Sequence, residues 1–573
     1  MSSSLAALPV IPPFAIFFAG ALLAALLRGR ARKAVLILAP FVGALFMLRL
    51  HSGTTWTMGF LGYELVPLRV DRLSLLFGWL FHLAALIGNV YALHLGKDER
   101  AGIQHTSAML YAGSALGAVF AGDLITLFVF WELLAFTSVF LIWARGSERS
   151  LRAGFRYLVV NVLSGVLLLS GALLRAYRTG SIEFGHIGLD GSLAAWLILL
   201  AFGIKSGFPL LHNWLTDSYP EATPTGTVFL SAFTTKVAVY ALARSFAGTE
   251  LLLYVGVVMT CFPIFYAVIE NDLRRVLSYS MINQIGFMVA GIGIGSALAV
   301  NGAVAHAFAD VIFKGLLFMT MGAVLHMTGR VNGSDLGGLY KSMPVTATMC
   351  IIGAASISAF PLFSAFVTKS MIMSAALEEG HKWLWLPLLF ASAGVLEHAG
   401  IKIPYFAFFA HDSGIRTKEA PKNMLVAMGV AALVCIAIGI FPGTFLALLP
   451  FDVAYVPYTV THVLTQTQLL VFGILAVAVL IRTGIYPAET PSVNLDFDWT
   501  YRRLGAAVVR AVGGGIRTVD LAVRSAVLEL VDTGLGFAVR GHGPKGALSR
   551  TWPTGSMVLW VAILLGISLF LYL

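Results

Sequence analysis

Long apolar stretches, separated by short charged or Gly/Pro-rich breaks, follow one another along almost the whole chain. Most are close to the length of about 20 residues that a helix needs to cross the hydrocarbon core of a bilayer. The pattern predicts an all-α polytopic membrane protein with about sixteen spans. We place them at residues 10–27, 34–50, 73–95, 104–121, 123–144, 153–176, 192–212, 222–246, 250–270, 274–294, 297–326, 345–377, 385–409, 424–449, 465–481 and 553–573.

The segment between the last two spans has a different pattern. Arg503, Arg510, Arg517 and Arg524 recur every seven residues, and apolar residues fill the positions between them. On a helix this gives a basic stripe opposite an apolar face, which suits an amphipathic helix along the membrane surface. The three glycines at 513–515 are expected to break or bend it. The helix is either a linker that touches only lipid or a lateral strut that holds a neighbouring subunit.

Positive charge is distributed unevenly between the loops. Alternate loops, which include residues 28–33, hold 26 of the 38 Lys and Arg residues. Because cytoplasmic loops are enriched in Lys and Arg, this side is predicted to be cytoplasmic and both termini to lie outside. The first apolar stretch has no basic segment or A-x-A site before it, so we expect a retained helix rather than a signal peptide. The net charge of +10 is therefore attributed to topology and lipid contact, not to nucleic-acid binding.

The composition supports a membrane protein and argues against bound cofactors. With 58% hydrophobic and 12% charged residues, the chain has too few polar side chains to cover a soluble surface. Cys261, Cys350 and Cys435 are scattered singly, so we expect no disulfide, iron–sulfur cluster, structural zinc or other metal site. The chain also has no Rossmann glycine fingerprint, and we expect no cofactor or redox centre on it.

Five lysines lie inside predicted spans. An unpaired charge in mid-membrane costs about 2.5–3.5 kcal/mol, so these amines are expected to be paired, hydrated or neutral. Intramembrane ionisable groups commonly mark an ion or proton pathway. The five are Lys205, Lys236, Lys314, Lys369 and Lys402.

A buried carboxylate and two helix breaks accompany the lysines. Glu132 lies deep in the fifth span, where it is predicted either to face a cation or to hold a proton. Lys205 precedes Pro209 by four residues, and a proline at this position interrupts a helix. The tetrapeptide that ends at Pro209 is echoed by the one that ends at Pro361, 152 residues later. Interrupted helices at matching places indicate a repeated unit with its working site at the breaks.

Further ionisable side chains form a possible proton relay in the second half of the chain. His306, Asp310 and Lys314 are spaced i, i+4 and i+8, which places them on one face of a helix. Histidine changes charge near neutral pH, so the row suits proton transfer. A polar stripe that only holds two helices together is the alternative. Possible additional relay residues are His326, Glu397, His398 and Lys402, although Lys402 could instead snorkel to the membrane surface.

Residues 202–224 and 235–240 resemble the signature of the antiporter-like subunits shared by respiratory complex I, membrane-bound hydrogenases and Mrp-type sodium/proton antiporters. Supporting motifs extend over roughly residues 70–410, and the D-type Mrp subunit is most similar. The resemblance implies about 14 core helices with two inverted five-helix repeats and broken helices. The implied divisions are N-terminal helices 1–103, repeats 104–249 and 250–410, core helices 411–481, a lateral segment 482–552 and a terminal helix 553–573.

The resemblance also implies roles for individual residues. Glu132 is similar to the glutamate of the fifth family helix and Lys205 to its partner on the seventh. Lys236 is similar to a bridging lysine, and Lys369 to an exit residue that is lysine or glutamate in different members. Residues 310–318 resemble the eleventh-helix lysine motif, although Ala309 stands where the family often has histidine, so His306 is expected to substitute.

These observations predict a proton-translocating subunit of a multisubunit complex in the bacterial cytoplasmic membrane. Its partners would be other integral membrane subunits and lipid, with Na⁺ or K⁺ exchanged against protons somewhere in the assembly. Alternatives are the membrane arm of an oxidoreductase, a proton-coupled partner in inorganic carbon uptake, and a scaffold without transport.

Overall fold

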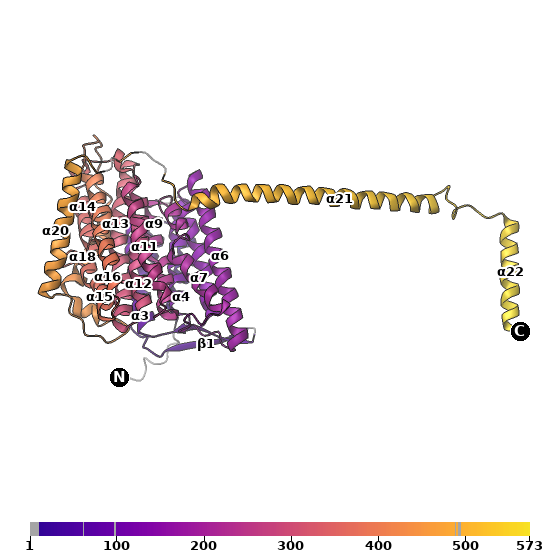
Figure 1. The fold of residues 1–573 in the computed structure, drawn as a ribbon, viewed down its shortest axis with the longest axis horizontal. Coiled ribbons are helices and arrows are strands. Elements are labelled where there is room, and N and C mark those ends of the chain that lie inside the picture. Colours follow the sequence, from indigo (N-terminus) through magenta and orange to yellow (C-terminus); the bar gives the residue numbers. More distant parts are fainter. Residues whose placement is uncertain (1–10, 61, 97–98, 487–488, 491–493) are drawn as a thin grey trace. The chain divides into compact units, whose positions relative to one another are not determined.

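A computed structural model of the chain describes residues 11–60, 62–96, 99–486, 489–490 and 494–573. The chain forms two compact units, residues 1–494 and 495–573. The first unit is a bundle in which most of the long helices lie side by side (Figure 1). The polytopic helical architecture predicted from hydropathy is confirmed by this bundle.

The N-terminal part of the bundle contains one feature that the apolar windows do not predict. A two-stranded antiparallel hairpin, with Thr55 opposite Arg69, precedes the third helix. Its strands are too short to register in a window sized for a membrane helix. The elements here are α1 (Pro13–Leu26), α2 (Gly29–Met47), β1 (Thr55–Phe60), β2 (Tyr63–Arg69) and α3 (Arg72–Ala92).

Each predicted repeat contains five crossing segments. The first consists of α4 (Glu99–Phe120), α5 (Leu124–Trp143), α6 (Glu148–Thr179), α7 (Leu193–Ser206) with α8 (Asn213–Ser218), and α9 (Pro224–Ala232) with α10 (Thr234–Ser245). The second begins with α11 (Leu251–Ile269), α12 (Leu273–Ile294) and α13 (Ala297–Thr328). It continues through η2 (Gly333–Asp335), η3 (Leu339–Lys341), α14 (Pro344–Ile357), α15 (Ser364–Glu378), α16 (Lys382–Val395), η4 (Leu396–Ile401), α17 (Lys402–Pro404) and η5 (Tyr405–Phe409). The unit ends with α18 (Lys422–Ile440), α19 (Pro442–Leu446) and α20 (Val460–Arg482).

The two repeats share local structure at equivalent places. Asp123 caps α5 and pairs through an isolated β-bridge with Glu183, just after α6. Asp272 caps α12 and pairs in the same way with Asn332, just after α13. α6 and α13 each have 32 residues and end at a left-handed glycine. These matches extend the short sequence echo to the whole five-helix unit.

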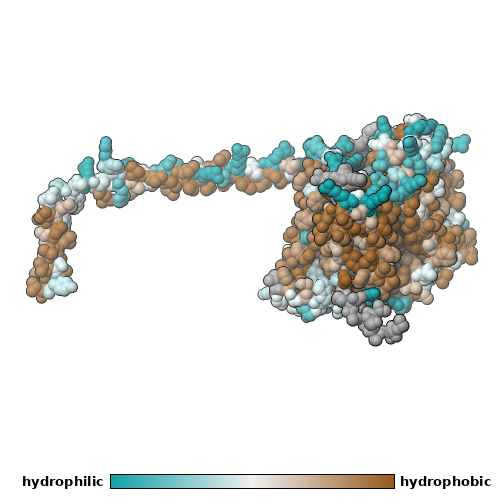
Figure 2. Space-filling model, turned by 180° about the vertical axis from the view of Figure 1, so that it is seen from behind, coloured by the Kyte–Doolittle hydropathy of each residue, from teal (hydrophilic) through white to brown (hydrophobic). Residues whose placement is uncertain are grey.

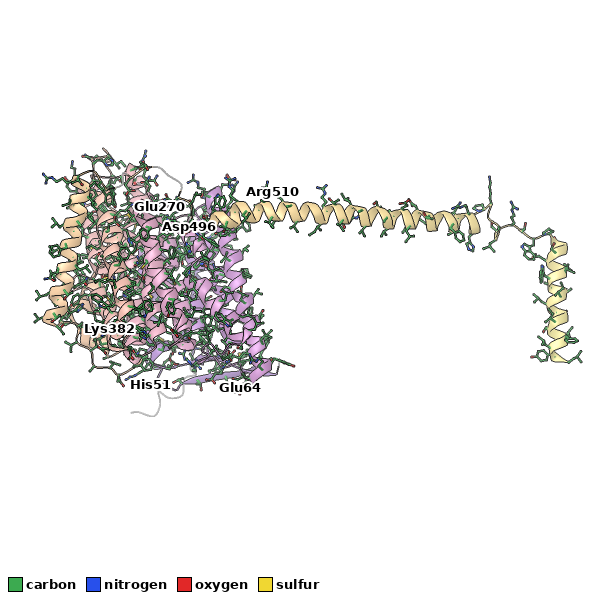
Figure 3. All side chains as sticks on the ribbon, viewed as in Figure 1. His51, Glu64, Glu270, Lys382, Asp496 and Arg510 are labelled. Carbon is green, nitrogen blue, oxygen red and sulfur yellow. The ribbon has the colours of Figure 1, made fainter. Side chains whose placement is uncertain are left out.

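The repeats run in opposite directions through the bundle. Val66 of the hairpin donates its amide to the Asp123 carboxylate at 2.7 Å, so α5 starts at the hairpin end. α12 starts beside Glu270, which lies at the other end from Glu64 of the hairpin (Figure 3). The inverted relation implied by the family resemblance is therefore present.

The fourth segment of each repeat is broken at the predicted proline. Gly207 and Leu210 flank Pro209 with left-handed backbone, φ 79° and 70°. Ala359 and Leu362 flank Pro361 in the same way, with φ 59° and 73°. Left-handed geometry costs a non-glycine residue about 1–2 kcal/mol, so the surrounding bundle must hold both breaks in place.

Two predicted spans are more irregular than the sequence indicates. The span at 222–246 is interrupted at Phe233, between α9 and α10. Its ring packs edge-on against Phe81 and Tyr111, so tertiary contacts override the local helical pattern. The span at 385–409 contains π-helical turns at Leu396–Ile401 and Tyr405–Phe409. The interruption at Phe233 has no adjacent proline or glycine, whereas Gly400 lies in the first π-helical turn and Pro404 directly precedes the second.

Eleven helices in the described part of the chain are long and apolar enough to cross a membrane. Three shorter apolar helices accompany them, and two of these, α7 and α14, are halves of the broken segments. A hydropathy window of about 20 residues merges each half-helix with the segment that follows the break. The number of about sixteen spans stays a prediction.

The second unit contains η6 (Thr500–Gly505), α21 (Ala506–His542) and α22 (Thr554–Tyr572). Hydrophilic and hydrophobic side chains separate onto two sides of α21 (Figure 2). The helix continues through residues 513–515, so the predicted break at the three glycines is wrong. Each glycine costs about 1 kcal/mol relative to alanine, and the helix of 37 residues continues in spite of this cost. Its position on a membrane surface stays a prediction.

Candidate functional site

A row of buried and half-buried ionisable side chains crosses the middle of the first unit, with the half-buried Glu132 as its first member. Glu132 lies about 12 Å along the axis of α5 from Leu124, and Lys314 about 25 Å along α13 from Ala297. Because α5 is about 30 Å long and α13 about 48 Å long, both residues lie close to the midpoint of their helices, where the centre of the hydrocarbon layer is expected. The five predicted intramembrane lysines are each no more than 2% exposed. The positions of the buried amines were therefore predicted correctly.

Lys205 contacts the backbone next to Glu132. It lies in the last turn of α7, and its ammonium donates to the Trp131 carbonyl and lies 4.5 Å from the centre of the Trp131 ring. Within the described ranges, Glu132 forms no ion pair within 4.0 Å, and its Oε1 atom has no hydrogen-bond partner. The Lys205 ammonium is nevertheless within electrostatic range of the carboxylate. The two groups are thus neighbours through residue 131, not a contact pair.

Gly165 on α6 makes room for the Glu132 carboxylate. A Cβ atom at position 165 would overlap Oε1 of Glu132. α6 packs against both α5 and α7, so the carboxylate projects between the helices that carry Glu132 and Lys205. Sequence reasoning missed this role, because a glycine among apolar residues has many explanations.

Within the first repeat, buried hydroxyl groups extend from α5 and α6 toward Lys236 on α10. Ser138 and Tyr157 share a hydrogen bond of 2.6 Å, and Tyr111 and Thr234 share another of 2.6 Å. The Tyr111 and Tyr157 hydroxyls are close enough to influence each other electrostatically. Thr234 lies two residues before Lys236 on α10. Each hydroxyl both donates and accepts, so the chain suits proton transfer, and sequence reasoning missed its two tyrosines.

Lys236 and Asp310 form an ion pair in the interior of the row. Their Nζ and Oδ2 atoms are 2.6 Å apart, and both side chains are completely buried. Lys236 also donates to the Ser231 carbonyl at 3.2 Å. Oδ1 of Asp310 has no hydrogen-bond partner among the residues that the structure describes. The sequence grouped Asp310 with its neighbours along α13, whereas its direct partner comes from α10.

Two further amines lie near the same carboxylate. Lys314 donates to Ser280 of α12 at 2.7 Å. Lys369 donates to the Ile357 carbonyl, at the break after α14, at 3.2 Å. Both ammonium groups are within electrostatic range of Asp310. Three amines therefore share one nearby carboxylate, so the net charge of the cluster depends on how many protons it holds, and the pairing depends on which amines hold them.

His306 connects α13 to α12 and α15. Its Nδ1 atom lies 2.9 Å from the Thr368 hydroxyl, and its Nε2 atom lies 3.0 Å from Oε1 of Gln284. The Gln284 amide then donates to Asn283 at 2.6 Å. A glutamine oxygen opposite Nε2 assigns a proton to Nε2. Sequence reasoning missed Gln284 and Asn283, because polar uncharged residues in an apolar span are common.

The polar track continues into the irregular thirteenth predicted span. His398 lies in the π-helical turn η4, fully buried, and neither ring nitrogen completes a hydrogen bond with a described residue. π-helical turns frequently occur at functional sites. Its ring is within electrostatic range of Lys314, Lys369 and Lys402, so it lies between the central cluster and the end of the track.

Lys402 is paired at the end of the track. Its Nζ atom lies 2.7 Å from Oε1 of Glu489, with side-chain exposures of 0% and 5%, and it also donates to the Val268 carbonyl at 2.6 Å. The Lys402 ammonium is therefore paired inside the protein, and whether it belongs to the relay or only reaches toward the membrane surface stays open. Beside it, Tyr486 donates to Glu397 at 2.5 Å. Sequence reasoning missed Glu489 because it follows α20, far along the chain and outside any predicted span.

His326 does not join the row. It lies in the last turn of α13, about 18 Å along the axis from Lys314. Its ring packs against that of His94, with centroids 4.8 Å apart. His94 in turn lies 3.4 Å from the Asn423 amide, so the three side chains form a separate polar contact. The structure thus separates His326 from the other predicted relay residues.

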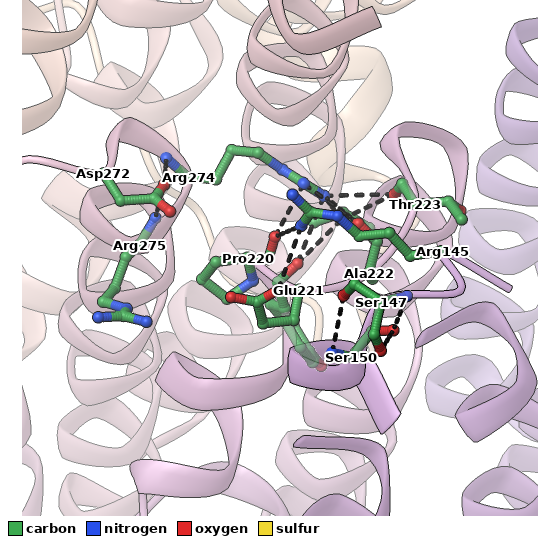
Figure 4. A network of polar contacts seen from close by, with 12 residues as sticks. Arg145, Ser147, Ser150, Pro220, Glu221, Ala222, Thr223, Asp272, Arg274 and Arg275 are labelled. Carbon is green, nitrogen blue, oxygen red and sulfur yellow. Dashed lines mark hydrogen bonds and ion pairs between the residues drawn. The ribbon is translucent and has the colours of Figure 1, made fainter. Parts of the chain in front are cut away.

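A buried arginine fixes the loop after the first break. Arg274 of α12 is fully buried and donates to the carbonyls of Pro220 and Ala222 at 2.9 and 3.1 Å (Figure 4). Arg145 donates to the Pro220 carbonyl at 2.6 Å and pairs with Glu221 at 3.5 Å. These contacts hold the end of the 202–224 motif against the second repeat. A rigid loop keeps the break beside Lys205 in one geometry.

Residues 121–395 match the family described as NADH:quinone oxidoreductase/Mrp antiporter, transmembrane region. This stretch, slightly less than half of the chain, is similar to the membrane region of that family. The match contains both breaks and the central cluster, and it ends before His398, Lys402 and Glu489.

Individual relatives agree with this assignment. The A1 component of the Na⁺/H⁺ antiporter of Staphylococcus aureus is 29% identical over 425 residues, covering 66% of this chain and 52% of its own length. The D-type component of the Na⁺/H⁺ antiporter of Bacillus subtilis is 27% identical over 361 residues, covering 59% of this chain and 72% of its own length. The chain therefore spans about half the length of the A1 component that it matches.

A solved structure reproduces the fold. A chain of the membrane-bound sulfane sulfur reductase, an archaeal respiratory membrane complex, superposes with a TM-score of 0.71 at 22% identity. The superposition covers 98% of this chain and 100% of the other. At this identity the likeness establishes the shared architecture alone.

Proposed function

We propose that this chain is a proton-translocating subunit of a multisubunit membrane complex. The observation that carries the proposal is the row of buried amines and acids at mid-membrane depth, centred on the Lys236–Asp310 ion pair. Buried charges are costly, and rows of them in membrane proteins typically carry ions or protons. A scaffold would have no use for them.

Proton movement along the row would proceed through changes of pairing. A proton that binds near Glu132 removes the negative charge close to Lys205, and Lys205 then favours giving up its own proton. The hydroxyl chain of Tyr157, Tyr111 and Thr234 leads from this first pair toward Lys236. At Lys236, a change of charge alters the competition among three amines for Asp310. The Lys402–Glu489 pair forms the far end of the track.

Two sources of energy are consistent with this pathway. Exchange against a monovalent cation, Na⁺ or K⁺, is supported by the names of the bacterial relatives, which are Na⁺/H⁺ antiporter subunits. Redox-driven translocation is supported by the solved respiratory complex whose chain matches 98% of this one. In that case we expect the redox centre on other subunits, because the cysteines of this chain occur singly. We place exchange first, because both sequence relatives are antiporter subunits, whereas the redox alternative is supported by fold alone.

The partners are proposed to be other integral subunits of the bacterial cytoplasmic membrane. The basic loops would face the cytoplasm and both termini the outside. α21 is proposed as a lateral strut that contacts a neighbouring subunit, because its apolar side chains are exposed along the whole helix. Changing Arg510 and Arg517 together to glutamate should weaken co-purification of partner subunits. Unchanged co-purification would leave α21 as a linker.

Proton flux in vesicles that contain the assembled complex tests the proposal. Lys205→Ala and Glu132→Gln should abolish flux and leave assembly intact, because neither change buries a new charge. Lys382→Ala, which removes an exposed lysine at a helix start, is the matched control and should retain flux. Normal flux in Lys205→Ala or Glu132→Gln vesicles would contradict the pathway. Dependence of wild-type flux on an imposed Na⁺ or K⁺ gradient, or on an electron donor, identifies the energy source.

A further inference from the structure

A groove of about 760 Å³ opens on the surface of the first unit between α1, α4 and α5. Its volume lies in the range of small-molecule binding sites. The groove follows α4 from Gly102 to Leu110, about 12 Å along the helix axis. Both α4 and α2 begin at this end of the groove, so it runs from a membrane boundary into the apolar layer. It is remote from the row of buried charges.

The mouth and the depth of the groove differ in chemistry. Arg28 and Arg32 line the mouth, at the start of α2. The hydroxyls of Thr106 and Ser107 lie one turn of α4 deeper. No acidic residue belongs to the described lining, and the remaining wall is mainly apolar: Ala25, Ile103, Leu110, Phe136 and Phe140. A cationic mouth above an apolar wall matches an amphiphile with an anionic head.

Arg32 is built into the groove rather than free in solvent. Its side chain is among the buried polar groups, at 7% exposure. Nε donates to the Leu27 carbonyl at 2.9 Å, which fixes the direction of the guanidinium. A Cβ atom on Gly102 would lie 3.2 Å from Nη1, so the absence of a side chain there lets the guanidinium lie against α4. Among the side chains that the structure describes, which do not include those of residues 97–99, the two Nη groups have no hydrogen-bond or ion-pair partner, so a nearly buried cation presents unused donors to the groove.

We propose that this groove binds an anionic glycerophospholipid. The phosphate would accept hydrogen bonds from Arg32 and Arg28, and one acyl chain would lie along Phe136 and Phe140. Arginine suits this role because its planar donors match phosphate oxygens in pairs. Basic pockets between transmembrane helices are known to hold anionic headgroups, and the lining hydroxyls add neutral donors for the ester oxygens. The lipid would fix α1 and α2 against α4 and α5, which form the entrance to the first repeat.

Lipid titration of the purified complex tests the site. The complex is stripped of lipid in dodecyl maltoside and titrated with phosphatidylglycerol, and bound lipid is counted by native mass spectrometry. Arg32→Gln should weaken binding about fivefold and the double change with Arg28→Gln about thirtyfold, from about 1 kcal/mol for each arginine. Arg30→Gln, a neighbouring exposed arginine that does not line the groove, should have no effect.

Other ligands and one further variant make the test decisive. Phosphatidylcholine with the same acyl chains should bind at least tenfold more weakly, and glycerol phosphate should not compete. Thr106→Phe, which fills the groove and keeps both arginines, should abolish retention even if Arg32→Gln fails to fold. Equal binding of the two lipids would indicate bulk lipid only, and competition by glycerol phosphate would indicate a free anion site. No retained lipid in the assembled complex would mean that another subunit fills the groove. Each of these three results would overturn the proposal.

Discussion

The Lys236–Asp310 pair allows the clearest test of stability against transport. At 2.6 Å, two opposite charges attract by about 6 kcal/mol if the effective dielectric constant is about 20. The cost of removing both from water offsets much of this attraction, so the pair itself adds little net stability. Breaking it is different, because Asp310→Asn leaves the Lys236 ammonium buried without its partner. We expect this variant to lose about 3–5 kcal/mol of stability.

A double-mutant cycle separates the two contributions. Lys236→Met with Asp310→Leu removes both charges and should be within about 1 kcal/mol of the wild type, because no buried charge is left unpaired. Thermal unfolding of the purified protein gives the stabilities, and proton flux in vesicles should be lost in both single variants and in the double variant. The Arg244–Asp71 pair is the matched control, since it is direct, at 2.7 Å, and lies away from the row. Asp71→Asn should cost less stability and retain flux.

Two results would refute this reasoning. Stability losses that add within about 0.5 kcal/mol would show that the two side chains do not interact. Retained flux in the stable double variant would show that the pair is structural and that protons take another path.

Individual contacts at three other places lead to further predictions. Gly165→Ala should reduce proton flux strongly with normal assembly, because the new Cβ atom would displace the Glu132 carboxylate. Gly429→Ala, whose Cβ atom would meet open space, is the control and should leave flux unchanged. Equal effects of the two variants on flux would refute the positioning role of Gly165. Glu489→Gln should slow proton flux and remove one of the titration steps on the acidic side of the flux–pH profile. Burial raises the pKa of Glu489 more than Lys402 lowers it, so this group takes up a proton at a higher pH than an ordinary glutamate. An unchanged flux–pH profile would exclude Glu489 from the track. Burial acts to raise the pKa of Asp71, but Arg244 and the Ser74 amide outweigh it, and the net pKa is below the ordinary value of 3.8. The stabilising effect of the Asp71 carboxylate should therefore be lost as the pH falls below about 3.8. Acid unfolding curves that coincide for the wild type and Asp71→Asn would contradict this.

The sequence predicts best those features that carry an energetic cost. A lysine in hydrocarbon is expensive enough to stand out, so Lys205, Lys236, Lys314 and Lys369 were found from the chain alone. Pro209 and its repeat partner predict the breaks, because proline is incompatible with a helix interior. The inverted arrangement needed the structure, since only four residues of the repeat are visible in the sequence.

The features that the sequence does not predict depend on contacts between distant segments. The break at Phe233 is set by aromatic packing against α3 and α4 rather than by a local signal. Glu489 reaches Lys402 from beyond α20, and Gly165 has a role only because Glu132 faces it. Conversely, the glycines at 513–515 are a strong local signal that a long, favourable helix overrides.

Ordered water between the buried charges gives the most direct test of the account. A high-resolution electron cryo-microscopy map of the assembled complex would show the space between Lys205 and Lys236, and between Lys314 and His398. The account predicts water molecules within hydrogen-bonding distance of these side chains, joined through Tyr157, Tyr111 and Thr234 in the first interval. Intervals filled only by aliphatic side chains, with no water and no hydroxyl contact, would contradict a proton pathway along this row.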